Sequence, residues 1–341
     1  MWQALIRFFF PKRSFVTASQ RSEVKKETLR LSEPQNPSTT LDIHEAFVRL
    51  VLSIYTFQDT QLSRIEKAAL QQIEDLLSAE VFDEKMVPRL PAVVPQLLCS
   101  LRSDDVSGKH LAEQIGHDPV LVGEVIRISN SAFYKSSSRI NSIERAVVIL
   151  GRTGLQRLIA NVVMKPIFNV HQGHFGQQGG SYLWSQSERC AFACAYLARS
   201  RYDPFDAYLA GMICKIGMIV AIRILDHLYK NCELPKSIHF YQTLVLKTKK
   251  LSRHIAERWQ FPVTVLDALE EQVSMDDQSN PATLGGVLYR ANRISELHIL
   301  VEEKHLEDDI DRLDQQLGGK LSDSDMRCYV ELKRMFNSRK S

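Results

Sequence analysis

The chain has 341 residues, of which 44% are hydrophobic, and its 43 Lys and Arg against 40 Asp and Glu leave a formal net charge of +3. This is the composition of an ordinary soluble globular protein, and the near-neutral charge does not favour nucleic acid or an anionic membrane as a partner. The six cysteines show no framework spacing and no CxxC motif, and a chain this long needs no disulfides to bury a core. We therefore expect reduced thiols in a cytoplasmic protein.

Residues 1–40 are expected to form a basic, largely disordered N-terminal segment. The opening "MWQALIRFFFPKRS" is interrupted by Arg7 and stopped by Pro11, well short of the roughly 20 residues of a membrane-spanning helix. It also lacks the long apolar centre of a secretory signal. Peripheral membrane contact through residues 1–13 remains a minor alternative, and the polar, aperiodic residues 11–40 predict a disordered linker.

Residues 41–85 are expected to form a helical N-terminal extension. The stretches "IHEAFVRLVLSIY" and "LSRIEKAALQQIEDLLSAE" repeat apolar residues three and four apart, with Asp59 or Thr60 as a helix cap between them. An amphipathic face usually packs within its own chain, so we expect both helices to pack on the main domain, whose start we place near residue 85.

Helix-start signals are clear beyond that boundary. Asp118 caps a helix that has Pro119 at its first position. Asn141 with Glu144 has the spacing of a capping box, and Gly151 ends the helix that follows. A further helix is expected from Thr153 to about Pro166.

The rest of the chain is predicted to be helical as well. The Gly-rich segment 171–181 is expected to separate two blocks, and Asp203-Pro204 begins one helix that contains "LAGMICKIGMIV". Further helices are expected at 238–259, 262–272 and 281–299, the last capped by Asn280-Pro281. Since no run alternates as a strand does, the fold class is all-α.

Two constellations suggest chemistry only weakly. Cys190 and Cys194 lie one helical turn apart and could share a zinc ion with Cys214, but four ligands are needed, and apolar packing explains cysteines between Ala and Phe better. The tight helical hairpin at 139–157 carries four arginines, Arg139, Arg145, Arg152 and Arg157, and could bind DNA as a helix-turn-helix does.

Several segments, in order, resemble the HDOD domain: "LPAVVPQLLCSL", "HDPVLVGEVIRISNSAFY", "INSIERAVVILGRTGLQRLI", "YLWSQSERCAFACAYLA", "DPFDAYLAGMICKIGMIV" and "HIAERWQFPVTVLDAL". HDOD is a divergent branch of the HD superfamily of metal-dependent phosphohydrolases, found in bacterial signalling proteins. The resemblance implies a multi-helical domain at 86–300, with blocks at 86–170 and 181–300, and leaves 301–341 as a charged helical tail. Its most specific run is Asn130, Ser131, Ala132, Phe133 and Tyr134.

The resemblance also implies where the HD metal site would lie. The position of a metal-binding His falls on Gln186, that of the His-Asp pair on Cys214 and Lys215, and that of the closing Asp on Asn292. The paired His of some relatives fall on Glu271 and Gln272. An ammonium is a poor ligand and repels a divalent cation, so we expect no metal, no cofactor and no catalysis. We further hypothesise that Lys215 takes the place of the lost metal ion, with its ammonium reaching water or a carboxylate.

The function implied by the resemblance is that of a non-catalytic scaffold in signal transduction, which binds signalling proteins or a small ligand. Two alternatives stay open: a residual metal-dependent nucleotide phosphohydrolase, and a nucleic-acid-binding regulator that uses the basic hairpin 139–157, which a chain without a net basic domain makes unlikely.

Overall fold

The computed structural model describes residues 42–80, 82, 86–87, 113, 115, 119–130, 140–168, 173–198, 201–229, 234–275, 282–316 and 321–336. Our expectations for residues 1–40, Asp118, Ser131, Phe133 and Tyr134 lie outside these ranges. Within them the structure contains no strand, and Gln58 and Ser237 form an isolated bridge. The predicted all-α class is confirmed.

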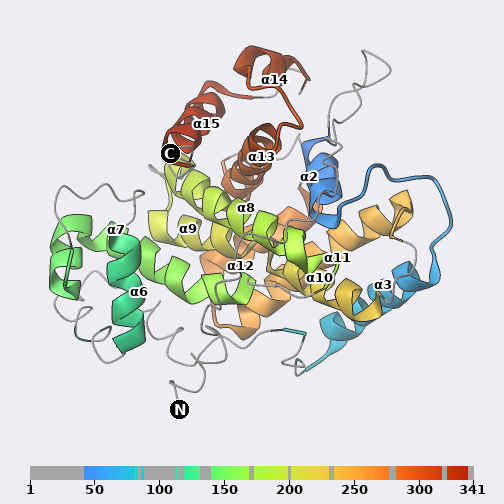
Figure 1. Ribbon diagram of the computed structural model, residues 1–341, viewed down its shortest axis with the longest axis horizontal. Coiled ribbons are helices and arrows are strands. Elements are labelled where there is room, and N and C mark those ends of the chain that lie inside the picture. The colour runs from blue at the N-terminus through green and yellow to red at the C-terminus, as the bar shows by residue number, and fades with distance from the viewer. Residues whose placement is uncertain are drawn as a thin grey trace, which may run out of the picture.

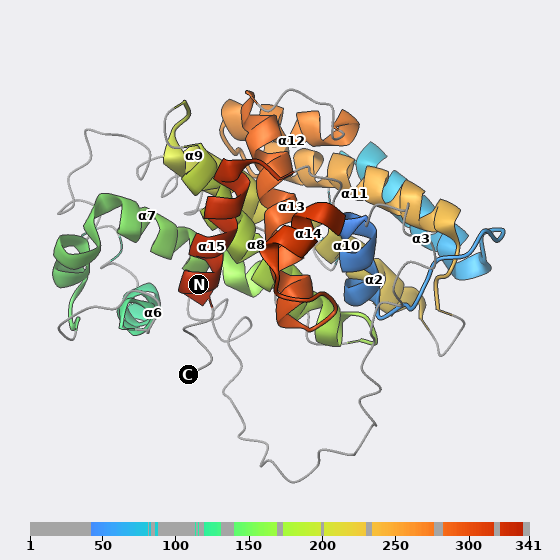
Figure 2. The ribbon, with the colours of Figure 1, turned by 90° about the horizontal axis from the view of Figure 1, so that it is seen from above.

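The helices come in two groups and a C-terminal set (Figure 1). Their bounds are α2 Ile43–Leu52, α3 Arg64–Ser78, α6 Pro119–Ser129, α7 Ile143–Phe168, α8 Gly176–Leu197, α9 Pro204–Ile213, α10 Ile216–Leu228, α11 Ile238–Arg258, α12 Val263–Ser274, α13 Leu284–Glu302, α14 Ile310–Gln316 and α15 Asp323–Phe336. Helices α6 and α7 project to one side of the bundle formed by α8–α13. Helix α15 packs on α8 and α13, as the view from above also shows (Figure 2).

The N-terminal extension packs within the chain, as expected. Helix α2 lies on α8 and α13, and α3 lies on α10 and α11. Phe47, Val51 and Leu52 of α2 are almost fully buried, and burial of side chains of this size contributes about 1.5–3 kcal/mol each. Helix α2 is therefore part of the wall around the centre of the bundle.

Three predicted caps are wrong by a few residues. Helix α3 is capped by Ser63 and not by Asp59 or Thr60, because Ser63 and Glu66 form a complete capping box. Helix α7 is preceded by Ser142, whose Oγ accepts from the backbone N–H of Arg145 at 3.2 Å, where we expected Asn141. Helix α13 is capped by Thr283, because its side chain reaches the backbone N–H of Gly286.

The Gly-rich segment is not only a separator. Helix α8 begins inside it, at Gly176, where the Asp226 carboxylate accepts from the backbone N–H groups of Phe175 and Gly176. A Cβ at Gly179 would lie 2.6 Å from the backbone oxygen of Val51, so this glycine lets α2 approach α8 closely. Gly151, in contrast, breaks α7 as predicted, with a φ of 63°; the second part of α7 runs two residues beyond Pro166.

The single helix expected after Asp203-Pro204 is two helices. Asp203 caps α9 as predicted, but α9 ends at Ile213 and α10 begins at Ile216. Cys214 and Lys215 form the break, and Lys215 has φ −102° and ψ 9°. The stretch Pro204–Leu228 has the length and hydropathy of a membrane span, yet 89% of its apolar window is buried inside the protein.

Candidate functional site

The break between α9 and α10 is held by the neighbouring helix α11. Ser252 donates through its Oγ to the backbone oxygen of Cys214 at 2.9 Å, and the same Oγ accepts from the backbone N–H of Gly217 at 2.9 Å. One serine thus satisfies backbone groups on both sides of the break. The break is consequently a defined feature that fixes where the side chains of Cys214 and Lys215 lie.

Lys215 forms a buried ion pair that the sequence did not reveal. Its Nζ lies 2.8 Å from Oε1 of Glu296 on α13, and the two side chains are 9% and 0% exposed. His44 of α2 contacts the same carboxylate oxygen through Nδ1 at 2.8 Å. The carboxylate foreseen as a partner for Lys215 is therefore Glu296, and α2 closes over the pair.

The carboxylate of Glu296 is ionised at neutral pH. Burial raises the pKa of Glu296, but the nearby His44 and Lys215 outweigh burial and lower this pKa from 4.5 to about 2. The ring of Phe47, with its centroid 5.9 Å from the Lys215 ammonium, covers the pair from α2. This is a charged pair enclosed on several sides.

Gln186 and Asn292 meet beside this pair. Gln186 donates through Nε2 to Oδ1 of Asn292 at 2.5 Å and to Oγ of Ser295 at 3.1 Å. Oε1 of Gln186 and Oε2 of Glu296 are buried, and neither has a hydrogen-bond partner among the described residues. Two buried acceptors without donors in one small region are costly in a purely structural cluster.

Cys214 faces a second cysteine and not a metal-ligand set. Its Sγ lies 3.9 Å from Sγ of Cys190, which is fully buried. Hydrogen bonding to Cys190 and burial raise the pKa of Cys214 well above its ordinary value. Both thiols are thus protonated at neutral pH, whereas a metal ligand must be a thiolate.

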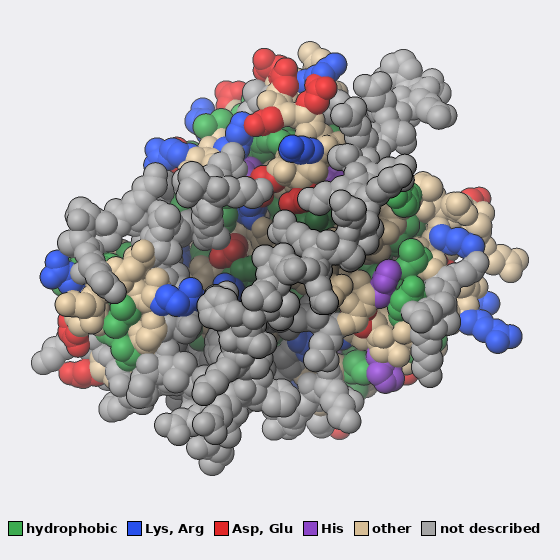
Figure 3. Space-filling view, viewed as in Figure 1, with side chains coloured by type: hydrophobic (Ala, Val, Ile, Leu, Met, Phe, Trp, Pro, Cys, Tyr) green, Lys and Arg blue, Asp and Glu red, His purple; other side chains and the backbone are tan. Residues whose placement is uncertain are grey.

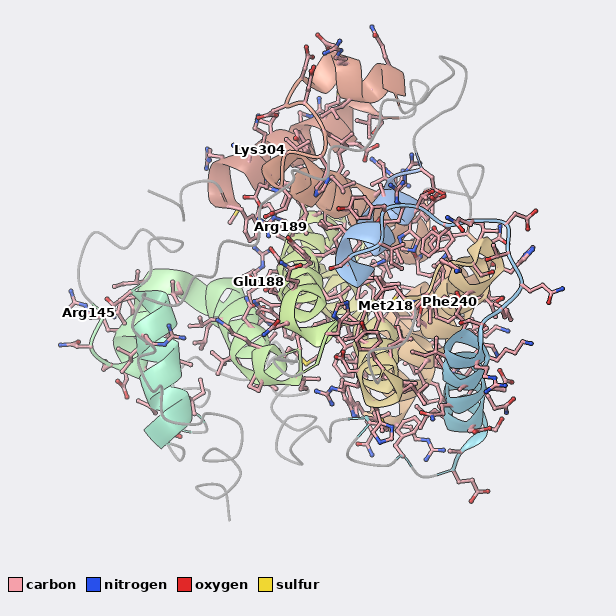
Figure 4. All side chains as sticks on the ribbon, turned by 45° about the vertical axis from the view of Figure 1, so that its right-hand side comes forward. Arg145, Glu188, Arg189, Met218, Phe240 and Lys304 are labelled. Atoms are coloured by element: carbon pink, nitrogen blue, oxygen red, sulfur yellow. The ribbon has the colours of Figure 1, made fainter. Side chains whose placement is uncertain are left out.

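A small cavity of about 30 Å³ opens at this place. Cys214, Lys215 and Asn292 line it, so three of the four expected positions meet there, and the fourth, Gln186, bonds to Asn292. Met218, which also lines it, lies near the middle of the molecule (Figure 4). Of the two other aligned positions, Gln272 lines the cavity, while Glu271 does not and accepts from Oγ1 of Thr283.

The side chains around the cavity do not fit a divalent metal ion. The Lys215 ammonium lies among them, the Glu296 carboxylate is already bonded to it, and the remaining donors are neutral amides and a protonated thiol. Within the described ranges no group of three or more His, Cys, Asp or Glu is arranged to hold a metal. Such a set offers neither the charge nor the ligand number that metal-assisted hydrolysis requires.

The expected motif residues outside the site have structural contacts. Asn130, at the end of α6, donates through Nδ2 to the backbone oxygen of Ile140 at 2.6 Å and accepts from its N–H at 2.8 Å. It therefore ties the end of α6 to the residues that lead into α7. Pro119 is the first residue of α6, as predicted, and Gly151 provides the break in α7.

The basic hairpin at 139–157 is partly engaged with the rest of the domain. The Arg157 guanidinium lies over the ring of Tyr208 on α9, 5.7 Å from its centroid, and Arg145 lies at the outer end of the α6–α7 block (Figure 4). Both signs of charge occur among the described side chains of the face in Figure 3.

Comparisons with known proteins agree with this fold. The HDOD domain family matches residues 87–275. An uncharacterized protein of Treponema pallidum (strain Nichols) is 24% identical over 243 residues, which are 67% of this chain and 46% of that relative, so the chain spans about half the relative's length.

Solved structures show the same fold at low identity. The crystal structure of an HDOD domain protein from Geobacter sulfurreducens has a TM-score of 0.53 and 18% identity, covering 79% of this chain and 99% of that one. A protein from Shewanella amazonensis SB2B, named as a candidate metal-dependent phosphohydrolase, has a TM-score of 0.51 and 20% identity, covering 80% and 99%. With a family match over more than half of its length, the chain belongs to the HDOD domain family.

Proposed function

We propose that the protein is a non-catalytic regulatory module of signal transduction, which works in the cytoplasm and binds protein partners or a small ligand. Family membership fits a regulatory or HD-like role, and a solved neighbour from Marinobacter aquaeolei VT8, with a TM-score of 0.53, is named as a candidate signal transduction protein. The observation that carries the non-catalytic reading is the buried ion pair between Lys215 and Glu296.

The ion pair supports this function because of where it lies. In the superfamily that this chain resembles, the positions of Cys214 and Lys215 hold the His-Asp pair that binds metal. Here the Lys215 ammonium supplies one positive charge there, and Glu296 neutralises it at 2.8 Å. A fixed ammonium can stabilise the helices that the metal would have joined, but it cannot lower the pKa of a bound water as a metal ion does.

The closure of the site by α2 supports the same function. His44 and Phe47 contact the ion pair from a helix that lies before the matched residues 87–275, and Glu296 lies after them. Segments outside the family match thus complete the cluster. In a regulatory module of this kind, a change in the ion-pair site would be transmitted through α2 and α13, the helices that enclose the ion pair.

Two measurements test the proposed function: the metal content of the purified protein and its hydrolysis of phosphate esters. The purified full chain is analysed for bound iron, manganese and zinc, and is assayed on phosphomonoester and phosphodiester substrates with each ion added. A quadruple variant that carries Gln186→His, Cys214→His, Lys215→Asp and Asn292→Asp is the matched comparison. We expect less than 0.1 metal ion per chain and no turnover in the parent, as the missing ligands require, and metal uptake in the variant if it folds.

Two results would contradict the proposal. Stoichiometric metal in the parent that disappears on Asn292→Ala would support the residual phosphohydrolase instead, as would hydrolysis that depends on an added ion and is lost in the same variant. The partner is sought by capture on the full chain and on a chain that lacks residues 1–40. A partner held by both forms would assign binding to the helical domain.

A further inference from the structure

A second lysine lines the cavity and has no partner among the described residues. Lys249 of α11 is half-buried, and no hydrogen bond or ion pair joins it to a described side chain. Lysines of this kind usually extend their ammonium into water or pair with a carboxylate. A half-buried lysine that lines a cavity without a hydrogen bond or ion pair to the described residues is therefore unusual.

Lys215 lines the same cavity and has N–H donors beyond the one that reaches Glu296. An ammonium carries three N–H donors, and among the described residues the hydrogen-bonding contact of Lys215 is to Oε1 of Glu296. Asn292 adds a neutral donor, since its Oδ1 already accepts from Gln186 and its Nδ2 remains as the donor end of the amide. Donors from α11, α13 and the α9–α10 break thus meet at one cavity.

The two ammonium groups repel one another there. Burial lowers the pKa of Lys249, and the positive charge of Lys215 lowers it further; Glu296 and Asp42 offset this only in part. An anion between the two lysines would remove the repulsion and raise the pKa of Lys249. His44, a third side chain that is cationic when protonated, also lines the cavity. The cavity is thus suited to negative charge and unsuited to a metal cation.

We propose that this cavity binds the phosphate group of a small phosphorylated molecule, held between Lys249 and Lys215. The proposal rests on the proposed function, because it needs a site in which Lys215 stands where a metal would be. A phosphate monoester carries about two negative charges near neutral pH, and lysines bind phosphate as point charges. Lys249 supplies the positive charge that Glu296 does not neutralise, and Lys215 and Asn292 add N–H donors that the several oxygens of a phosphate can accept from at once.

The size of the cavity limits what enters it. A water molecule needs about 10–15 Å³ of such volume, so about 30 Å³ holds two or three water-sized atoms. A phosphate group has four oxygens around its phosphorus, so the cavity takes part of the group, and it is far too small for a nucleoside. The remainder of the ligand must therefore extend outward past the rim, and inorganic phosphate is the simplest probe of the headgroup site.

The experiment is a titration of the full chain with sodium phosphate, followed by calorimetry and thermal unfolding, against sodium chloride of equal ionic strength. Sulfate and acetate serve as a tetrahedral dianion and a planar monoanion. Lys249→Met removes the charge and keeps the length of the side chain. The matched control is Lys250→Met, because Lys250 is the next residue of α11 and is exposed.

We expect saturable binding of phosphate and of sulfate in the parent and in the Lys250→Met protein, weaker binding of acetate, and at least a tenfold loss in the Lys249→Met protein. Lys249→Arg should keep part of the affinity, because the charge remains. No binding by the parent beyond the chloride control overturns the proposal, and so does an equal loss in the Lys249→Met and Lys250→Met proteins.

The failure of this proposal and of the proposed function can be told apart. Phosphate that binds without turnover of phosphate esters supports both. Phosphate esters that are hydrolysed with an added metal ion overturn the non-catalytic function, whatever the titration shows. A parent that neither binds phosphate nor hydrolyses esters overturns the phosphate site alone and leaves the regulatory module to a different ligand or a protein partner.

Discussion

Two buried polar clusters join the same pair of helices, α8 and α13, and they differ in what borders them: α15 covers one, and α2 and a small cavity border the other. The Lys215 cluster comprises Gln186, Lys215, Asn292 and Glu296 with His44 above it. The Arg189 cluster lies farther along both helices, where Arg189 of α8 donates to His298 and Glu302 of α13 and to Ser185 of its own helix. Figure 4 labels Arg189 on α8.

The Arg189 cluster has the character of a structural joint. The guanidinium spreads its donors in a plane and reaches several acceptors at once, including Nδ1 of His298 at 3.0 Å. The ring of Phe336 from α15 lies 4.6 Å from its central carbon and covers it. The C-terminal helix therefore covers this cluster.

The Lys215 cluster borders a cavity. Lys215 and Asn292 line the cavity that Lys249 also lines. On the phosphate proposal the Lys215 cluster is a wall of the binding site, and the Arg189 cluster is a joint between helices.

The largest predicted effect on stability comes from replacing one partner of the ion pair between Lys215 and Glu296. Glu296→Leu and Lys215→Met are each expected to lower the free energy of unfolding by about 3–5 kcal/mol, because each leaves a buried charge with less compensation. The double variant should lie within about 1 kcal/mol of the parent, since it removes both charges. Urea unfolding at pH 7 measures all three.

The control for this prediction is an exposed ion pair. Glu74 and Lys247 join α3 to α11 with side chains 52% and 20% exposed, and Glu74→Leu should change stability by less than about 1 kcal/mol. A Lys215→Met protein as stable as the parent would contradict the idea that Lys215 takes the place of a metal ion.

The helices themselves could largely be predicted from the sequence, because their signals are local. Apolar periodicity and caps such as Asp203-Pro204 depend on neighbouring residues alone, and α9 begins where this pair predicts. The break at Cys214-Lys215 could not be predicted, because the apolar pattern runs straight through it. The start of α8 inside the Gly-rich segment could not be predicted either, since Gly179 is required by the close approach of α2.

The site was only half predictable for a related reason. Resemblance identified Gln186, Cys214, Lys215 and Asn292, and the structure brings them together, but it gave no indication of Glu296 or His44. His44 lies 252 residues from its partner Glu296, so their pairing depends on how α2 packs on α13. One signal was present: Glu296 is a charge inside the apolar run "ISELHIL", one helical turn after Asn292.

The second prediction concerns how the free energy of unfolding depends on pH. Because the pKa of Glu296 is lowered from 4.5 to about 2 in the folded protein, its stabilising contribution is complete above pH 4.5 and is lost as the pH falls towards 2. The loss is on the order of 3 kcal/mol. Unfolding of the parent and of the Lys215→Met, Glu296→Leu double variant is compared from pH 5.5 to 2.5. The other carboxylates titrate in both proteins, so the difference between them isolates this pair; parallel curves would show that the pair contributes nothing.

The smallest effect tests the Arg189 cluster. Arg189→Lys keeps the charge, but an ammonium cannot reach His298, Ser185 and Glu302 with the planar geometry of the guanidinium, so we expect a loss of about 2 kcal/mol in urea unfolding. Arg312→Lys, in the exposed pair with Glu307, is the control and should change stability by less than about 0.5 kcal/mol.

Phosphate affinity distinguishes the clusters further. If the Arg189 cluster only joins α8 to α13, Arg189→Lys lowers stability and leaves phosphate binding as it is in the parent. A loss of phosphate binding comparable to that of Lys249→Met would mean that the two clusters act as one site, with α8 and α13 transmitting the change between them.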